Sequence, residues 1–313
     1  MALMPLELSF RTADAGGDIN TAPDLSQFLQ LSHRELILFV HGFNNTVSQA
    51  RDAYAGFMAN QQLLACVPTG GDFAPGQQIV EIFWKGDDWG VMSALYYADA
   101  VPNSVITGRA LGQVLQALAV GRGESLEVSI VAHSLGTRLA LECLKEIGAT
   151  PAVLVNHIVF FAAATATFML DSEAEVHGLR RPLNSVSGGS VSLYSGADMV
   201  LALAFPPGQT FSHGQEGFFP TALGHAEWET PTPPPLLNQA ENTGAGHSDY
   251  WGWSHKHPKC EARASKYARD TLELPFIGSR DLTSRDMTAR DASDARGLQL
   301  RDVADRATSS RPQ

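Results

Sequence analysis

The chain has 313 residues and a mass of 33.6 kDa, enough for one large α/β domain or two small ones. Its formal net charge of −11 argues against nucleic acid or an anionic membrane as the main partner. The cysteines, Cys66, Cys143 and Cys260, are too few and too scattered for a disulfide framework. No run of roughly 18 apolar residues occurs, so we expect no transmembrane helix. The opening segment, MALMPLELSF, lacks the pattern of a signal peptide, which favours a cytoplasmic location.

Strand-like runs alternate with helical patterns through most of the chain. The runs that predict strands cover residues 6–10, 36–40, 79–84, 126–131, 155–162, 190–194 and 226–229. The patterns that predict helices cover residues 24–31, 47–64, 99–120, 134–147 and 199–204. We expect Asp24 to cap the first helix, and the helix within 99–120 to begin after Pro102-Asn103-Ser104. This alternation favours a mostly parallel sheet of about seven strands with helices on both faces.

A serine stands where a buried strand gives way to a helix, in the segment Val131-Ala132-His133-Ser134-Leu135-Gly136. Such a sharp strand-to-helix turn strains the serine backbone and lifts its hydroxyl clear of the sheet, which is the arrangement of a nucleophile elbow. The residues two before and two after must be small because the chain doubles back there, and Ala132 and Gly136 satisfy this requirement. The pattern therefore predicts Ser134 as a nucleophile.

A second motif follows the predicted strand that ends at Val40. The strand runs directly into His41-Gly42-Phe43-Asn44-Asn45. In enzymes with a nucleophile elbow, the loop after such a strand supplies one backbone N–H of the oxyanion hole, and the residue after the nucleophile supplies the other. The predicted donors are Phe43 and Leu135, and Gly42 lets the backbone approach a bound carbonyl closely.

The two segments FVHGFNN (residues 39–45) and VAHSLGTRLALE (residues 131–142) resemble a bacterial branch of the α/β-hydrolase superfamily. Members of this branch are mostly uncharacterised serine hydrolases or esterases, and the resemblance spans about residues 35–255. It implies an α/β-hydrolase fold in which His41 and His133 orient loops or line the pocket together with Gly42 and Trp84. The chain departs from the branch at Trp84, where Phe-Trp-Lys replaces the usual Ser-Trp-Pro, and at Thr165, where aspartate is common.

The acid of a serine hydrolase in this fold comes after the nucleophile in the chain, at the end of a later strand. Asp198 has this setting, because it follows the predicted strand 190–194 and precedes a predicted helix. The alternative is that Asp198 only caps that helix, since we expect one aspartate to perform only one of the two tasks well. Asp171 is the second candidate for the acid.

The histidine base should follow the last strand of the sheet. The candidates are His213, His225, His247, His255 and His257. His247 is favoured because its neighbouring glycines permit a tight loop, and because Gly246-His247-Ser248 matches the segment that carries the catalytic histidine in the family resembled. His225 precedes the predicted strand 226–229 and is therefore on the wrong side of it.

The residues considered so far predict a serine esterase that acts on a small-molecule ester, with no cofactor. A competing zinc site could be formed by His255, His257 and Cys260, although their neighbouring lysines would oppose a cation. There is no Walker A loop and no G-x-G-x-x-G, so no nucleotide cofactor is indicated. The other hypotheses are a non-catalytic binding or scaffold protein with the same fold, and a lipase or thioesterase for acyl chains. Oligomeric state is not indicated.

The composition of the chain changes twice towards its end. Residues 205–246 are rich in Pro, Gly, His and aromatics, which is typical of either a substrate-shaping lid or a surface loop without a role. Beyond Ile277, arginine recurs mostly at every fifth residue, usually followed by aspartate, which predicts a disordered and nearly charge-balanced tail. We therefore expect a hydrolase domain over residues 1–277 and a low-complexity tail over residues 278–313.

Overall fold

Parallel strands form the centre of the computed structural model. The model describes residues 5–13, 17–31, 35–65, 77–86, 93–148, 152–170, 178–212, 217–228, 237–252 and 256–274. All of these lie in one compact unit, Met1–Pro275, whereas the second unit, Phe276–Gln313, lies outside the described residues together with the predicted tail. Within the described part, no helix has both the length and the hydropathy needed to cross a bilayer.

The described strands pair into one seven-stranded sheet. They are β1 (Leu6–Ser9), β2 (Glu35–Val40), β3 (Gln77–Phe83), β4 (Leu126–His133), β5 (Val153–Phe161), β6 (Ser190–Tyr194) and β7 (Asn238–Glu241). The order in the sheet is β1-β3-β2-β4-β5-β6-β7, and every neighbouring pair is parallel. This arrangement confirms the predicted α/β-hydrolase fold, and it places the carboxyl ends of β2, β4, β6 and β7 at one edge of the sheet.

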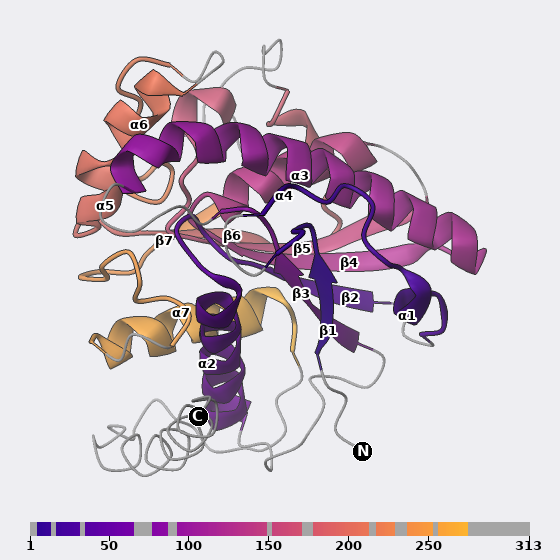
Figure 1. The fold of residues 1–313 in the computed structure, drawn as a ribbon. Helices are drawn as coiled ribbons and strands as arrows, with labels where there is room; N and C mark the ends of the chain where they lie inside the picture. Colours follow the sequence, from indigo (N-terminus) through magenta and orange to yellow (C-terminus); the bar gives the residue numbers. More distant parts are fainter. Residues whose placement is uncertain are drawn as a thin grey trace, which may run out of the picture. The chain divides into compact units, whose positions relative to one another are not determined.

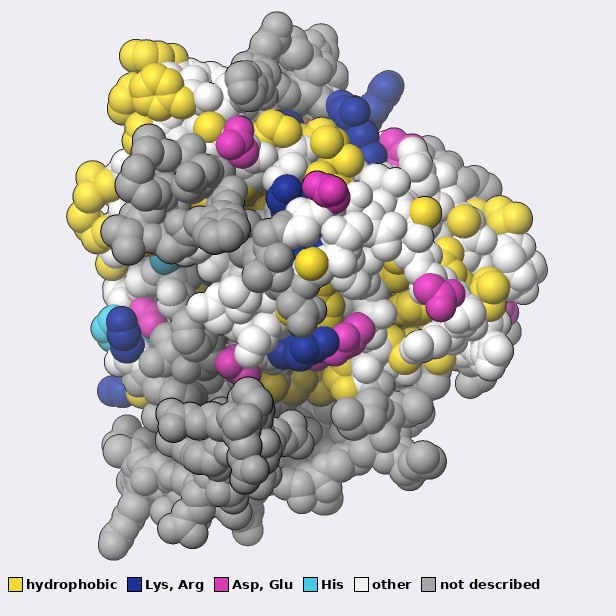
Figure 2. Space-filling view, in the orientation of Figure 1, with side chains coloured by type: hydrophobic (Ala, Val, Ile, Leu, Met, Phe, Trp, Pro, Cys, Tyr) yellow, Lys and Arg dark blue, Asp and Glu magenta, His cyan; other side chains and the backbone are white. Residues whose placement is uncertain are grey.

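Helices cover both faces of the sheet. They are α1 (Ser26–Leu29), α2 (Val47–Ala65), α3 (Ser93–Arg122), α4 (Gly136–Ile147), α5 (Met199–Leu203), α6 (Phe205–Phe211) and α7 (Pro258–Thr271), with two 3₁₀ turns, Thr167–Leu170 and Arg181–Ser185. The long α3 packs beside α4 on one face, whereas α2 and α7 lie on the other (Figure 1). Figure 2 shows hydrophobic side chains at the surface over α5 and α6.

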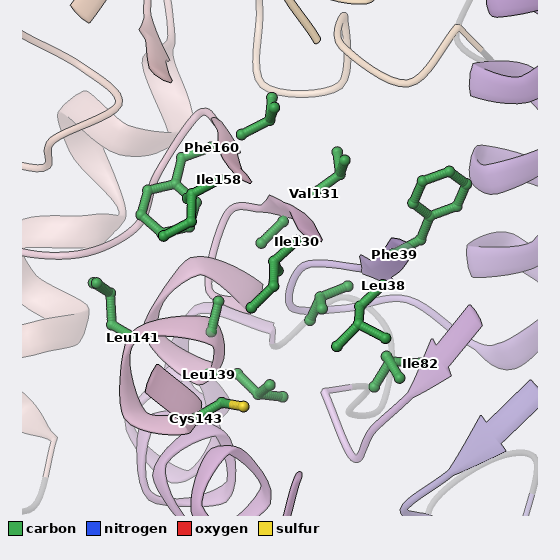
Figure 3. Packing of buried hydrophobic residues seen from close by; sticks show 14 of the residues in the cluster. Leu38, Phe39, Ile82, Ile130, Val131, Leu139, Leu141, Cys143, Ile158 and Phe160 are labelled. Atoms are coloured by element: carbon green, nitrogen blue, oxygen red, sulfur yellow. The ribbon is translucent and has the colours of Figure 1, made fainter. Parts of the chain in front are cut away.

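The core lies on both sides of the central strands. Leu38 and Ile130 point towards the side of the sheet that carries Leu139 of α4, whereas the next residue of each strand, such as Phe39, points to the opposite side (Figure 3). There the ring of Phe39 packs edge-on against Phe57 of α2, with centroids 5.2 Å apart. Burial on both faces explains why these strands are continuous apolar runs rather than alternating ones.

The predicted boundaries were wrong at two helices. Helix α3 begins at Ser93, so that Pro102 lies inside it instead of before it. Asp24 does not cap α1, whose N-cap residue is Leu25. The carboxylate of Asp24 instead accepts hydrogen bonds from the backbone N–H and the hydroxyl of Ser26. These bonds form a local turn at the start of the helix.

The prediction of the last strand was also wrong. Residues 226–228 are not a strand, and β7 is formed by Asn238–Glu241. Trp228 is attached to β7 through a side chain, because its backbone N–H donates to the side-chain oxygen of Gln239 and its carbonyl accepts from the same amide. The Gln239 amide therefore provides for Trp228 the two hydrogen bonds that a neighbouring strand would have supplied.

Candidate active site

Ser134 lies in a strained turn between β4 and α4. Its backbone φ of 53° is in the left-handed region, which a residue with a side chain rarely adopts. The turn is fixed from β5, because the Ser134 N–H donates to the carbonyl of Phe161 at 2.9 Å. A side chain at Gly136 would collide with the carbonyl of His41, which accounts for a glycine at this position.

The structure brings Ser134, His247 and Asp198 together from three separate segments. The Nε2 atom of His247, in the loop after β7, lies 2.9 Å from the Ser134 Oγ atom. Its Nδ1 atom lies 2.8 Å from the Oδ2 atom of Asp198, which follows β6. Because Asp198 is acceptor-only when ionised, the imidazole proton sits on Nδ1 and leaves Nε2 free to accept from Ser134.

The other candidate residues are not at this site where the structure describes them. His225 lies in a turn that its backbone N–H closes by donating to the carbonyl of Ala222, and its Nδ1 is buried without a hydrogen-bond partner. His257 instead bonds to Asp249. Asp171, His213 and His255 lie outside the described residues.

Asp198 makes both sets of contacts that the sequence presented as alternatives. Its Oδ1 atom caps α5 by accepting from the backbone N–H groups of Val200 and Leu201 at 3.1 Å and 3.0 Å. The other oxygen, Oδ2, is left to face His247. The carboxylate is fully buried, and the cap fixes the direction in which Oδ2 points.

The loop that carries His247 is held from two sides. The His133 Nε2 atom lies 2.8 Å from the backbone oxygen of His247, so it must carry a proton and donate. Burial, and next the proximity of His247, lower the pKa of His133 to about 3, which keeps this ring neutral. On the other side, the buried Asp249 accepts from the backbone N–H of Gly246 at 2.7 Å and bonds to His257. Sequence reasoning missed Asp249, although its spacing of three residues from Gly246 is typical of an aspartate that closes a turn.

Two backbone N–H groups beside Ser134 are turned away from the hydrogen bonds that hold their loops. The carbonyl of Gly42 accepts from the His41 ring and from the side chain of Asn45, so the N–H of Phe43 in the same planar peptide points the opposite way. The carbonyl of Ser134 accepts from Thr137 and Ala164, which turns the N–H of the next residue, Leu135, away from them. Within the described residues, neither the Phe43 nor the Leu135 N–H donates a hydrogen bond.

Gly42 allows the loop after β2 to lie directly on the elbow. A Cβ atom at this position would be 2.7 Å from the Cβ of Ser134 and 2.9 Å from Nδ1 of His133. Trp84 does not line the pocket but lies behind the loop, fully buried. Its indole N–H donates to the carbonyl of His41 at 2.9 Å, and the two rings are stacked. Trp84 therefore packs against the buried side of the loop and holds His41 in place.

A cavity of about 350 Å³ opens above Ser134. The described residues of its wall combine aromatic and aliphatic side chains with a few polar groups, and none of them is Asp, Glu, Lys or Arg. Besides Ser134 they are His41, Phe43, Asn44, Asn45, Gln49, Ala53, Tyr97, His133, Ala164, Val200, Leu201, Ala204, Phe205, His247, Ser248 and Trp251. An uncharged, mostly apolar wall suits an uncharged, apolar substrate group.

Two of the three residues of the alternative zinc site, His257 and Cys260, are described, and each has another partner. His257 is engaged with Asp249, and the Cys260 thiol faces the carbonyl of Thr243. No group of three or more His, Cys, Asp or Glu side chains among the described residues is arranged to hold a metal ion.

The sequence over residues 19–176, half of the chain, matches the family described as alpha/beta hydrolase of unknown function (DUF900). The chain belongs to this family. The matched residues of this α/β-hydrolase include the elbow and the loop after β2, whereas Asp198 and His247 lie beyond them. No curated protein matches the chain.

Solved structures similar to this α/β-hydrolase have low sequence identity. TT1662 from Thermus thermophilus is 15% identical, with 77% of this chain and 88% of that chain covered and a TM-score of 0.43. A thermophilic esterase from the Planctomycetes species Thermogutta terrifontis, bound to propionate, is 14% identical, with 79% and 86% covered and a TM-score of 0.38. The RedJ thioesterase of prodiginine biosynthesis in Streptomyces coelicolor is 12% identical, with 75% and 86% covered and a TM-score of 0.39.

Proposed function

We propose that this chain is a serine hydrolase that cleaves carboxylic esters through a covalent acyl-enzyme. The observation that carries the proposal is the continuous series of hydrogen bonds from the Ser134 hydroxyl through His247 to Asp198. A serine hydroxyl is a weak nucleophile until a base takes its proton, and a histidine oriented by a carboxylate is such a base. The resemblance of segments 39–45 and 131–142 to a bacterial branch of serine hydrolases in the α/β-hydrolase superfamily also supports the proposal.

The first half of the reaction forms the acyl-enzyme. The Ser134 oxygen attacks the ester carbonyl carbon while its proton passes to Nε2 of His247, and the Asp198 carboxylate stabilises the resulting imidazolium. The negative charge that develops on the carbonyl oxygen is accepted by the N–H groups of Phe43 and Leu135, next to the positive end of the α4 dipole. Loss of one such donor typically lowers kcat by about 10²–10³. The tetrahedral intermediate then expels the alkoxide, which takes the proton from His247.

The second half of the reaction repeats these steps with water. His247 removes a proton from the water molecule, whose oxygen attacks the acyl carbon, and the same two N–H groups stabilise the second tetrahedral intermediate. Collapse of that intermediate releases the carboxylic acid and returns the proton to Ser134. An ester is favoured over an amide as the substrate because an alkoxide is the easier leaving group.

Hydrolysis of p-nitrophenyl esters of graded chain length tests the proposal. We expect the wild-type protein to release p-nitrophenol, and Ser134→Ala to lower kcat by about 10⁴–10⁶. The matched control is Ser187→Ala, because Ser187 is an exposed serine that bonds to the carbonyl of Val155, away from the site. Full turnover by the Ser134→Ala protein, or no turnover of any ester by the wild type, would contradict the proposal.

A further inference from the structure

Helices α5 and α6 are fixed to the body of the hydrolase by their inner faces. Leu201 and Phe205 are each only 2% exposed. The side-chain amide of Gln209 donates to the hydroxyl of Tyr97 in α3 at 3.1 Å, and the absence of a side chain at Gly208 lets α6 lie directly on the Tyr97 ring. These contacts set the direction in which the outer faces of α5 and α6 point.

The outer faces are also apolar. We name as the apolar rim the exposed side chains of Met199, Val200, Leu203, Phe211, Phe218 and Phe219. Phe211 is 75% exposed and Phe218 is 82% exposed, and hydrophobic side chains project from the surface over α5 and α6 in Figure 2. The loop that carries the last two phenylalanines is joined to α6, because the Phe219 N–H donates to the hydroxyl of Thr210 at 2.8 Å.

The apolar rim lacks the charges that a surface in water normally carries. Residues 199–212 and 217–223 contain no Asp, Glu, Lys or Arg, although these types make up 18% of the chain. The four residues between these ranges contain one carboxylate, Glu216, and no Lys or Arg. A helix on a protein surface usually has a polar face opposite its buried one, whereas α5 has apolar side chains on both. Exposed apolar side chains that gather on two consecutive helices and on the loop joined to them mark a site of interaction.

The apolar rim is continuous with the wall of the cavity above Ser134. Val200 lines the cavity and is 47% exposed, and Leu201, Ala204 and Phe205 of the same two helices also line it. Among the described residues, an apolar group that lies on the rim can therefore pass into the cavity along uncharged side chains. Because the rim and the cavity wall are both apolar, we expect the partner that binds the rim and the substrate group that enters the cavity to be apolar as well.

From these contacts we propose that the apolar rim docks onto a surface of uncharged or zwitterionic lipid, and that the substrate is a lipid ester whose acyl chain passes from that surface into the cavity. The proposal rests on the proposed function. The formal net charge of −11 and the lack of any cation in the rim segments disfavour an anionic surface. A second copy of the chain is disfavoured as the occupant, because it would cover the cavity at Val200 and block the entry of substrate.

Binding to vesicles tests the docking surface without catalysis. The probe is phosphatidylcholine vesicles, and the protein is the full chain carrying Ser134→Ala, with or without Phe211→Ser and Phe218→Ser. We expect these two rim substitutions to weaken co-sedimentation at least tenfold. Val120→Ser is the matched control, because Val120 is an apolar residue that is 76% exposed on α3 and lies outside the rim. Equal co-sedimentation of rim and control variants, or stronger binding to phosphatidylglycerol vesicles, would overturn the proposal.

A kinetic comparison tests the lipid substrate. Hydrolysis of tributyrin is measured below its solubility limit and as an emulsion. The quantity compared between variants is the rate on the emulsion divided by the rate on dissolved tributyrin. We expect Phe218→Ser alone to lower this ratio several-fold and Val120→Ser to leave it unchanged. An unchanged ratio in the Phe218→Ser protein, or a wild-type dimer in solution that the rim substitutions dissociate, would overturn the proposal. Labelling of Ser134 by a fluorophosphonate separates this failure from a failure of the proposed function, since labelling needs no lipid surface.

Discussion

His133 and His247 are joined by a hydrogen bond of 2.8 Å between the Nε2 atom of the first and the backbone oxygen of the second. The residue directly before the proposed nucleophile therefore holds the loop of the proposed base. Their rings lie 5.0 Å apart between centroids, and His133 stays neutral because burial lowers its pKa to about 3. A neutral His133 adds no repulsion when His247 takes up a proton.

Replacement of His133 tests this positioning. We expect His133→Phe to lower kcat by about 10–100-fold with little change in KM, because the loop of His247 loses its anchor and small displacements of a base are costly. His133→Gln keeps a side-chain N–H donor and should recover part of the loss. The measurement is steady-state hydrolysis of a soluble ester from pH 5 to 9, where the wild-type profile should contain no ionisation of His133. Equal kcat for the wild-type and His133→Phe proteins would show that the bond is dispensable.

The two tasks of Asp198 are separated by a pair of substitutions. Asn is also a good helix cap, so Asp198→Asn should keep the stability of the protein. Its amide N–H₂ would face Nδ1 of His247 and stabilise the wrong tautomer, which should lower kcat by about 10⁴. Asp198→Ala loses both functions, and should in addition lower the free energy of unfolding by about 1 kcal/mol. Urea denaturation and ester hydrolysis measure the two effects; if the Asn variant remains active, Asp198 serves only as a cap.

Gly42 is predicted to tolerate no side chain. A Cβ atom there would lie 2.7 Å from the Cβ of Ser134, so either the loop of Phe43 or the elbow must move. We expect Gly42→Ala to lower kcat/KM by about 100-fold, which is the typical effect of a displacement near 1 Å. Gly196→Ala is the control, since a Cβ at Gly196 meets no atom within 4 Å although the residue is close in sequence to Asp198. The same activity in both variants would exclude the close approach as a requirement.

Glu81 should make the stability of the fold depend on pH. Burial, aided by Glu7 and opposed by Arg51, raises its pKa from an ordinary value of 4.5 to about 7. Between these two pH values the folded state binds more protons than the unfolded state, so the free energy of unfolding falls as the pH rises and is level above about pH 7. We expect Glu81→Gln to be more stable than the wild type by about 1–3 kcal/mol at pH 8, and equally stable at pH 4. Urea denaturation at both pH values measures the free energy of unfolding of the two proteins. If the difference between them were the same at pH 4 and pH 8, the raised pKa of Glu81 would be contradicted.

Local sequence signals were sufficient for the elbow and for the sheet. The requirement for a small residue at Gly136 and the apolar runs of β2, β4 and β5 follow from short-range sterics and burial, which the sequence displays directly. The prediction of His247 depended on its glycine-rich loop, on the order of elements along the chain, and on the match of Gly246-His247-Ser248 to the family resembled.

The errors arose where tertiary contacts replace local preference. Strand β7 is the polar segment Asn238–Glu241, which pairs at the edge of the sheet and carries little hydrophobic signal. Pro102 predicts a helix boundary because proline lacks the N–H of a helix interior, although α3 continues through it. The two sets of contacts that Asp198 makes could not be predicted, because the sequence does not show which carboxylate oxygen faces which neighbour.

The most direct test of the account is covalent labelling of Ser134 by a fluorophosphonate probe. The reagent phosphonylates a serine whose proton is removed by a neighbouring base, so the mass of the intact wild-type protein should increase by one adduct. Peptide mass spectrometry should place that adduct on Ser134, and His247→Ala should slow labelling by several orders of magnitude. Persistent labelling in the Ser134→Ala protein, or an adduct on another serine, would contradict the assignment of the nucleophile.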